Sequence, residues 1–143
     1  MNWLRKLAAV VGRQTAEPEH LRRGRIGEEA ARRYLRGRGL KPLTTNFRSP
    51  RGELDLICRD GDCLVFVEVK TRTSGQWTRP AAAVNARKRR LLTRTAFDYL
   101  AKLHHPPVKL RFDIVEVLLE EGRVAEVRHL PNAFPLTAPH RYG

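Results

Sequence analysis

Three carboxylates and one lysine, Glu53, Asp55, Glu68 and Lys70, lie within one short segment of this chain. An ion pair between Glu68 and Lys70 cannot neutralise the other two carboxylates as well, so the group keeps a net negative charge. Carboxylate oxygens are the hard ligands that magnesium and manganese ions prefer. The residue types therefore predict a divalent metal site, provided that the fold brings the four side chains together.

The segment that carries these residues has the pattern of a β-hairpin. Residues 53–58 and 63–71 are rich in apolar and β-branched residues, and Asp60-Gly61 between them is a turn signal. With the turn centred on this pair, Asp55 is expected to face Phe66, and opposed residues share a face. All four charged side chains are then expected on one face, whereas a shift of one residue would separate the carboxylates of the two strands.

The second run of this hairpin is predicted to be a central strand. Residues 64–67 and Val69 are apolar, which is typical of a strand covered on both faces. Glu68 and Lys70 interrupt this apolar run, and buried charge has to be compensated. A surface edge strand with solvated charges is the ordinary alternative, but the grouping of the charges on one expected face favours a metal site.

The rest of the chain supplies further elements for a sheet with helices on both faces. Apolar residues recur at helical spacing in residues 21–37 and 81–103. Residues 40–48 predict a strand before the hairpin, and residues 108–119 and 124–130 predict a second hairpin. The order helix, strand, hairpin, helix, hairpin predicts a mixed sheet in an α/β sandwich.

The chain's 143 residues suffice for one domain. We expect this domain at residues 21–134, between a flexible or short-helical extension at residues 1–20 and a C-terminal tail at residues 135–143. The chain is expected to be irregular from Pro131. The apolar run near the N-terminus is short and is interrupted by Arg5 and Lys6, so it predicts neither a secretory signal nor a membrane span. A cytoplasmic location is therefore the expectation.

The charge balance predicts a polyanionic partner. Lys and Arg number 28 against 15 Asp and Glu, which gives a formal net charge of +13, and such an excess favours binding to nucleic acid phosphates. A membrane surface or the ribosome would attract an equally basic protein. The predicted phosphate contacts are Arg72 and the basic run Arg87, Lys88, Arg89 and Arg90, although most charge runs form solvated faces.

The motifs of this chain resemble those of one bacterial protein family. They are Gly27-Glu28, the GELD sequence of residues 52–55, the VFVEVKTR sequence of residues 65–72 and Arg111-Phe112-Asp113. The pattern is similar to the YraN family of predicted nucleases, within the PD-(D/E)XK superfamily, over about residues 21–134. The proline that the wider superfamily places before its motif aspartate is replaced here by Leu54.

The resemblance implies a restriction-endonuclease-like fold, a three-layer α/β/α sandwich with a mixed central sheet. It also implies a magnesium- or manganese-dependent DNA endonuclease, including action on branched DNA as in the similar archaeal Holliday-junction resolvases. Asp55, Glu68 and the backbone carbonyl of Val69 would hold the metal ion. Lys70 would orient or deprotonate the attacking water or stabilise the transition-state charge, and Glu28 would reach the metal ion through water or help to place the nucleophile. Lys88 is the nearest counterpart of a Gln or Lys on the second helix of the superfamily.

For Lys70, the adjacent carboxylates are expected to raise the pKa of the ammonium group, which favours a positioning role over base catalysis. The competing interpretation of the chain is a nucleic-acid-binding protein that has the nuclease fold without turnover. A structural protein with a stabilising ion would leave the net charge of +13 unexplained. The sequence leaves open the shape of the substrate and whether the chain forms a homodimer.

Overall fold

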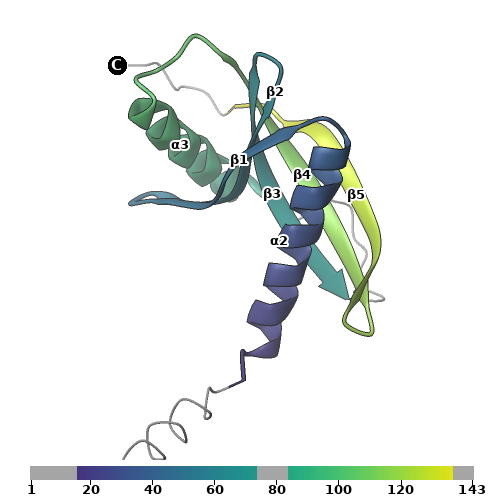
Figure 1. Cartoon of the computed structure of the whole chain (residues 1–143). Coiled ribbons are helices and arrows are strands. Elements are labelled where there is room, and N and C mark those ends of the chain that lie inside the picture. Colours follow the sequence, from purple (N-terminus) through teal and green to yellow (C-terminus); the bar gives the residue numbers. More distant parts are fainter. Residues whose placement is uncertain (1–15, 74–83, 137–143) are drawn as a thin grey trace, which may run out of the picture.

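A single mixed sheet of five strands lies at the centre of the computed structural model, which describes residues 16–73 and 84–136 (Figure 1). The strands lie in chain order across the sheet: β1 (Lys41–Ser49), β2 (Gly52–Asp60), β3 (Cys63–Thr73), β4 (Lys109–Glu120) and β5 (Arg123–Phe134). Neighbouring strands are antiparallel except β3 and β4, which are parallel. A parallel pair needs a crossover connection, and helix α3 (Ala86–Lys102) lies in that connection.

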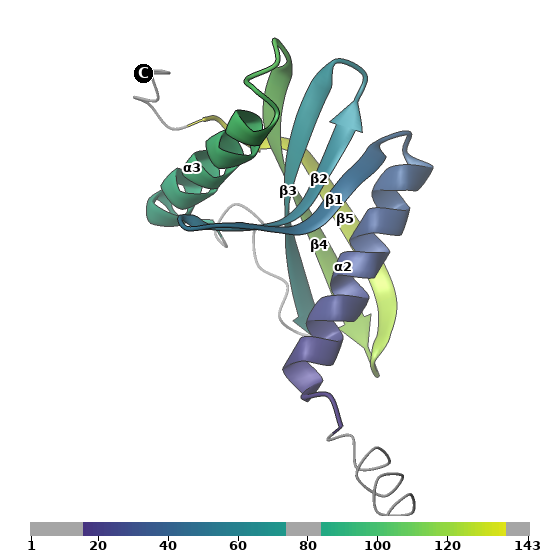
Figure 2. The same ribbon diagram turned by 60° about the vertical axis from the view of Figure 1, so that its left-hand side comes forward.

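The two helices cover opposite faces of the sheet (Figures 1 and 2). Helix α2 (Glu19–Gly37) packs Ala31 and Leu35 against one face, and α3 packs Leu92 and Leu100 against the other. The predicted helices and strands are all present, and the predicted α/β/α sandwich with a mixed sheet, of the restriction-endonuclease-like kind, is confirmed.

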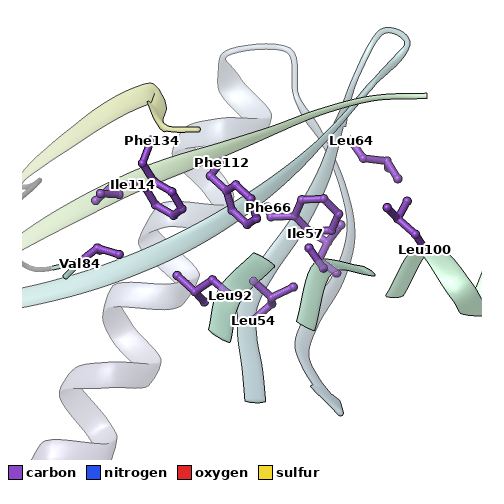
Figure 3. Packing of buried hydrophobic residues seen from close by; sticks show 11 residues of the cluster. Leu54, Ile57, Leu64, Phe66, Val84, Leu92, Leu100, Phe112, Ile114 and Phe134 are labelled. Carbon is purple, nitrogen blue, oxygen red and sulfur yellow. The ribbon is translucent and has the colours of Figure 1, made fainter. Parts of the chain in front are cut away.

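Aromatic packing fixes β3, β4 and β5 against α3 (Figure 3). The rings of Phe112 and Phe134 stack with centroids 4.8 Å apart, and the rings of Phe66 and Phe112 lie 5.5 Å apart. Fully buried aromatic side chains contribute large apolar areas to the core. This core therefore holds β3 rigidly just before the strand reaches Glu68.

The register of the β2–β3 hairpin differs from the prediction by two residues. Asp60 pairs with Cys63 and Ile57 pairs with Phe66, so the turn consists of Gly61 and Asp62, and the expected pairing of Asp55 with Phe66 is wrong. Gly61 has a φ of 58°, which suits glycine as the first central residue of a two-residue hairpin turn. A shift of two residues keeps every side chain on its predicted face.

Strand β2 separates from β3 part of the way along its length. The β2–β3 pairing ends at Leu56 and Val67, whereas β2 continues to pair with β1 as far as Gly52. The β1–β2 hairpin then extends toward α3 (Figure 2), and Leu54 belongs to the core on the α3 side. We call the point where β2 leaves β3 the fork.

A buried carboxylate joins three elements at a distance from the fork. Asp113 is fully buried on β4; it accepts hydrogen bonds from the Arg111 guanidinium at 3.0 Å and the Asn132 backbone N–H at 2.9 Å, and lies 2.7 Å from His129 Nε2. Arg111 also bonds Asp60 on β2 at 2.8 Å. A buried charge is tolerated when it is fully paired, so this network fastens β5 to the sheet.

Most of the predicted N-terminal extension and of the C-terminal tail lies outside the described residues. Strand β5 continues to Phe134, so the expectation of an irregular chain from Pro131 is wrong for residues 131–134. Helix α2 begins at Glu19, two residues before the predicted start of the domain. Neither α2 nor α3 is long and apolar enough to cross a membrane, among the residues that the structure describes.

Close packing of α2 on β3 depends on Gly27. A Cβ atom at this position would collide with the side chain of Thr71 on β3, so a larger residue would push the helix away from the strand. At Gly24, on the same helix, an added Cβ would meet no atom of the described chain within 4 Å. Gly27 therefore determines how closely α2 approaches β3, and with it the position of the neighbouring Glu28.

We expect Gly27→Ala to destabilise the protein by roughly 1–3 kcal/mol, because overpacking forces the helix or the strand to shift. Gly24→Ala is the matched control and should stabilise by about 0.5–1 kcal/mol, since alanine has the higher helix propensity. Urea denaturation of both variants measures the difference. Equal stability of the two variants would show that α2 does not depend on close contact at Gly27.

Candidate functional site

Asp55 and Glu68 meet at the fork. They stand next to Leu56 and Val67, the last paired residues of the hairpin, line the same cleft and interact electrostatically, so their predicted proximity is confirmed. The backbone N–H of Val69, beyond the end of the ladder, donates a hydrogen bond of 2.8 Å to Asp55 Oδ2. The Asp55 carboxylate thus accepts the hydrogen bond that the backbone carbonyl of a paired strand would accept if the ladder continued.

The Val69 carbonyl faces the fork as well. In an extended strand the N–H and C=O of one residue point to the same side, and the Val69 N–H points at Asp55. The fork therefore gathers two carboxylates and one backbone carbonyl. These are the three groups that the sequence resemblance assigns to a metal ion.

The two carboxylates repel each other. Burial, the charge of Glu68 and the charge of Glu28 raise the pKa of Asp55 to about 7, although the Val69 N–H pulls it down. Glu68 itself is 6% exposed. Desolvation and a neighbouring like charge both disfavour an ionised carboxylate, so the fork attracts positive charge.

Two lysines share one oxygen of Glu68. Lys88 Nζ lies 2.6 Å and Lys70 Nζ 3.4 Å from Glu68 Oε1. Lys88 arrives from the first turn of α3, where the Asn85 side chain caps the helix by accepting a 2.9 Å hydrogen bond from the Lys88 N–H. Asparagine is a preferred N-cap residue, and this cap determines where α3 begins and hence where Lys88 points.

The pKa of Lys70 moves opposite to the expected direction. Burial and the adjacent Lys88 ammonium lower it, and the charge of Glu68 does not compensate. The pKa of Lys88 is raised. Burial alone would lower it, but the hydrogen bond to Glu68 and the charges of Glu68 and Asp55 outweigh the effect of burial. The prediction for Lys70 failed because it counted the carboxylates and neither the burial of the ammonium group nor the second lysine.

Glu28 reaches the same site from α2. Burial raises the pKa of its carboxyl group, and the charges of Glu53 and Glu68 act in the same direction. A hydrogen bond with the Asn46 side chain lowers it. Glu28, Asp55, Glu68 and Lys70, which the sequence predicted as one group, are therefore close enough to interact electrostatically.

A cleft of about 310 Å³ opens beside the carboxylates, between the β1–β2 hairpin and α3. Its lining consists of Arg51, Gly52, Glu53, Asp55, Glu68, Lys88, Leu91 and Leu92. Glu53 lies at the rim, 3.7 Å from Arg48, with 44% of its side chain exposed. Glu53 is thus on the predicted face but more solvated than Glu68.

Comparison with known proteins assigns the chain to a family. The model of an uncharacterised protein family, UPF0102, matches residues 27–117, a segment that contains Glu28, Asp55, Glu68 and Lys70. The chain belongs to UPF0102, the YraN family. The family resemblance read from the sequence is therefore confirmed.

Relatives from several bacteria match most of the chain. A UPF0102 protein of Geobacter metallireducens is 42% identical over 113 residues, which cover 79% of this chain and 92% of the relative. One from Pelotomaculum thermopropionicum is 43% identical over 112 residues, covering 78% and 93%. One from Porphyromonas gingivalis is 42% identical over 119 residues, covering 82% and 87%.

The predicted phosphate contacts of this UPF0102 protein have different surroundings. Arg87 and Arg90 are exposed on α3. Arg89 turns inward, where its Nε donates to the Val84 carbonyl at 3.0 Å and its guanidinium lies over the Phe134 ring. Lys88 is engaged by Glu68. The basic run thus divides into two exposed arginines and two residues with partners inside the protein.

The donor set at the fork fits a hard divalent cation. Among the described residues, no three His, Cys, Asp or Glu side chains gather into a group that could hold a metal ion. Two carboxylates and the Val69 carbonyl would therefore be the protein's ligands, and water or phosphate oxygens would complete the coordination. The raised pKa of Asp55 supports this fit, because a cation relieves the repulsion that causes it.

Sequence reasoning overlooked a second buried carboxylate on the same face of the sheet. Glu116 on β4 is fully buried, and neither of its carboxylate oxygens has a hydrogen-bond partner in the described part of the chain. Burial raises its pKa, against the opposing charges of Arg72 and Arg128. Its signal in the sequence was an acidic residue inside the apolar run of residues 112–119.

We expect Asp55→Asn to stabilise the protein in the absence of metal ions. A carboxyl group whose pKa rises on folding destabilises the folded state as pH increases from the unfolded value, 3.8, to the folded value, about 7. The variant should therefore exceed the wild type by roughly 2–4 kcal/mol at pH 8, and the advantage should vanish near pH 3.8.

Urea denaturation in EDTA across this pH range measures the difference. Asp62→Asn is the control for the same change of side chain, because Asp62 lies in the hairpin turn, away from the fork, with 75% of its side chain exposed. A stability difference for Asp55→Asn that stays constant with pH would contradict the assignment of a raised pKa to Asp55.

Proposed function

We propose that this UPF0102 protein is a cytoplasmic DNA endonuclease that hydrolyses phosphodiester bonds with a magnesium or manganese ion. The observation that carries the proposal is the meeting of Asp55, Glu68 and Lys70 at the fork, with Glu28 reaching them from α2. A buried carboxylate and a half-buried one beside a lysine are a costly arrangement for a protein interior. Such a cost is typical of functional sites.

The charge distribution supports a nucleic acid as the substrate. The protein carries a formal net charge of +13, yet the floor of the cleft is acidic at Asp55 and Glu68. A basic surface attracts a polyanion, and carboxylates repel it unless a cation lies between them. A metal ion bound between the carboxylates of the fork and a phosphodiester would remove this repulsion.

Each residue at the fork has a role that its surroundings support. Asp55, Glu68 and the Val69 carbonyl would hold the metal ion, which would supply an acidified water and offset negative charge on the scissile phosphate. Lys70, whose pKa is lowered by burial and by Lys88, orients the attacking water or accepts its proton. Lys88, raised in pKa by Glu68 and Asp55, stays charged and binds a phosphate oxygen.

A DNA-binding protein without turnover is the second candidate, and one observation favours it. Lys70 and Lys88 together already neutralise Glu68 without any metal ion. A site that is satisfied in this way can persist for the stability of the fold alone. The two candidates differ in what Glu68 does when a divalent metal is added.

We expect Glu68→Gln to separate DNA binding from cleavage. The variant keeps the size of the side chain but removes a negative charge that repels phosphate, so in EDTA it should bind DNA at least as tightly as the wild type. In Mg²⁺ or Mn²⁺ it should lose cleavage by about 100-fold or more, because a misplaced metal ligand removes transition-state charge stabilisation.

Labelled linear, single-stranded, flap and four-way DNA substrates give the measurement, with the exposed Glu126→Gln as the control for the charge change. Unchanged cleavage by purified Glu68→Gln would point to a contaminating nuclease or to a different site. A wild type inactive on all four substrates in both metals would favour the DNA-binding protein.

DNA affinity should depend steeply on salt. The logarithm of the binding constant should fall linearly with the logarithm of salt concentration, by about 0.9 for each phosphate contacted on duplex DNA. Arg90→Gln should reduce this slope by about one contact, because Arg90 is exposed on α3, the helix that also supplies Lys88 to the cleft.

Arg36→Gln makes the same charge change on the exposed end of α2, across the sheet, and should leave the slope nearly unchanged. Fluorescence anisotropy in EDTA measures both variants. Affinity that does not change between dilute and physiological salt would exclude phosphate neutralisation as the basis of binding.

A further inference from the structure

A second cleft lies close to the fork, between α2 and β3. It has a volume of about 400 Å³ and opens where the first half of α2 lies beside the end of β3 (Figures 1 and 2). Its lining consists of His20, Arg23, Gly24, Val69, Thr71 and Thr73. We call it the α2 cleft. Val69 connects it with the fork, because the Val69 N–H donates to Asp55 there and the same residue lines the α2 cleft.

The α2 cleft lies on the side of β3 that β2 leaves open. Strand β3 continues to Thr73, whereas its pairing with β2 ends at Val67. On its other side β3 stays paired with β4 to the end of the strand, and no described residue of β4 lines the cleft. A nucleic acid strand that lies at the fork and continues along β3 therefore reaches the α2 cleft next.

The charge of Arg23 is left without a counterion in this cleft. On either side of it in the chain, Arg22 pairs with Glu19 at 3.7 Å and Arg25 pairs with Glu17 at 3.0 Å. Arg23 is half-buried, and among the described residues its guanidinium has no ion pair or hydrogen bond. A partly desolvated charge is unfavourable unless it is paired. The α2 cleft therefore favours an anion.

The groups around Arg23 suit a phosphate. Guanidinium N–H groups bind phosphate oxygens bidentately, and a threonine hydroxyl such as that of Thr71 can donate a further hydrogen bond. None of the described lining residues is acidic, whereas the fork carries Asp55 and Glu68. The α2 cleft can therefore bind a phosphate directly, and the carboxylates of the fork repel one unless a cation lies between them.

We propose that the α2 cleft is a phosphate-binding subsite, in which Arg23 and Thr71 bind a backbone phosphate of the DNA strand that lies at the fork. The inference rests on the proposed function for the identity of this strand, but binding at the subsite can be tested without cleavage. Thr71 follows Val69 by two residues, which is about 7 Å along an extended strand. The subsite thus fixes the strand a short distance from the phosphate at the fork.

Arg23→Gln should weaken DNA binding in EDTA and reduce the salt slope by about one contact. Arg22→Gln is the matched control, because it makes the same charge change at the adjacent exposed residue, and it should leave the slope nearly unchanged. Arg23→Lys keeps the charge and should keep the slope. Fluorescence anisotropy at several salt concentrations measures the three variants, and their melting temperatures, which should equal that of the wild type, show that each is folded.

A second measurement reports on the contact itself. In ¹⁵N-labelled wild-type protein in EDTA, DNA should shift the side-chain Nε–H resonance of Arg23 and leave that of Arg22 in place. On a substrate that is cleaved, an uncharged methylphosphonate at the contacted position, within about three nucleotides of the cut, should slow cleavage by the wild type. Cleavage by Arg23→Gln should not respond to this substitution, because the variant already lacks the contact.

An unchanged salt slope in Arg23→Gln, or an Arg23 resonance that DNA does not move, would overturn the inference and leave the nuclease proposal intact. A resonance that moves with inorganic pyrophosphate but not with DNA would also overturn it, because the cleft would then hold a free phosphate compound. If the wild type binds DNA and cleaves nothing, the nuclease proposal fails, and the slope and the resonance alone decide the subsite. A wild type that binds no DNA overturns both.

Discussion

Repulsion between two carboxylates in a partly buried space is the constraint on which this molecule depends. Asp55 and Glu68 come from neighbouring strands that part at the fork, and burial raises the pKa of Asp55 with the help of Glu68. An interior of low polarity magnifies such repulsion. Two lysines beside Glu68 and a backbone N–H beside Asp55 reduce this repulsion, and the cleft opens the two carboxylates to solvent.

The sandwich delivers these groups from three layers. The sheet provides the carboxylates and Lys70, α3 provides Lys88 through its Asn85 cap, and α2 provides Glu28. Each layer needs its own packing to be accurate, because an ion pair of 2.6 Å such as that of Lys88 and Glu68 tolerates little displacement. The aromatic core under α3 and the close approach of α2 at its glycine supply that accuracy.

The fold and the core of the site could be predicted because local patterns determine them. Alternation and turn chemistry indicated the hairpin, and the shared face of Asp55 and Glu68 survived an error of two residues because the side-chain period of a strand is two. The exact turn was missed, since Gly61 can occupy either of two central positions. The pKa of Lys70 and the inward turn of Arg89 were missed because they depend on partners distant in the chain, Lys88 and Phe134.

The Asp113 network has a consequence for how such proteins can diverge. It fastens β5 and the end of β2 by bonds from Arg111, His129 and the Asn132 backbone, and none of these groups belongs to the cleft at the fork. The residues of the Asp113 network, which hold the sheet together, are therefore different from the acidic residues of the candidate site. A lineage can lose the acidic residues of the fork and keep the sandwich, or exchange them for other side chains, without first having to find a new way to fold.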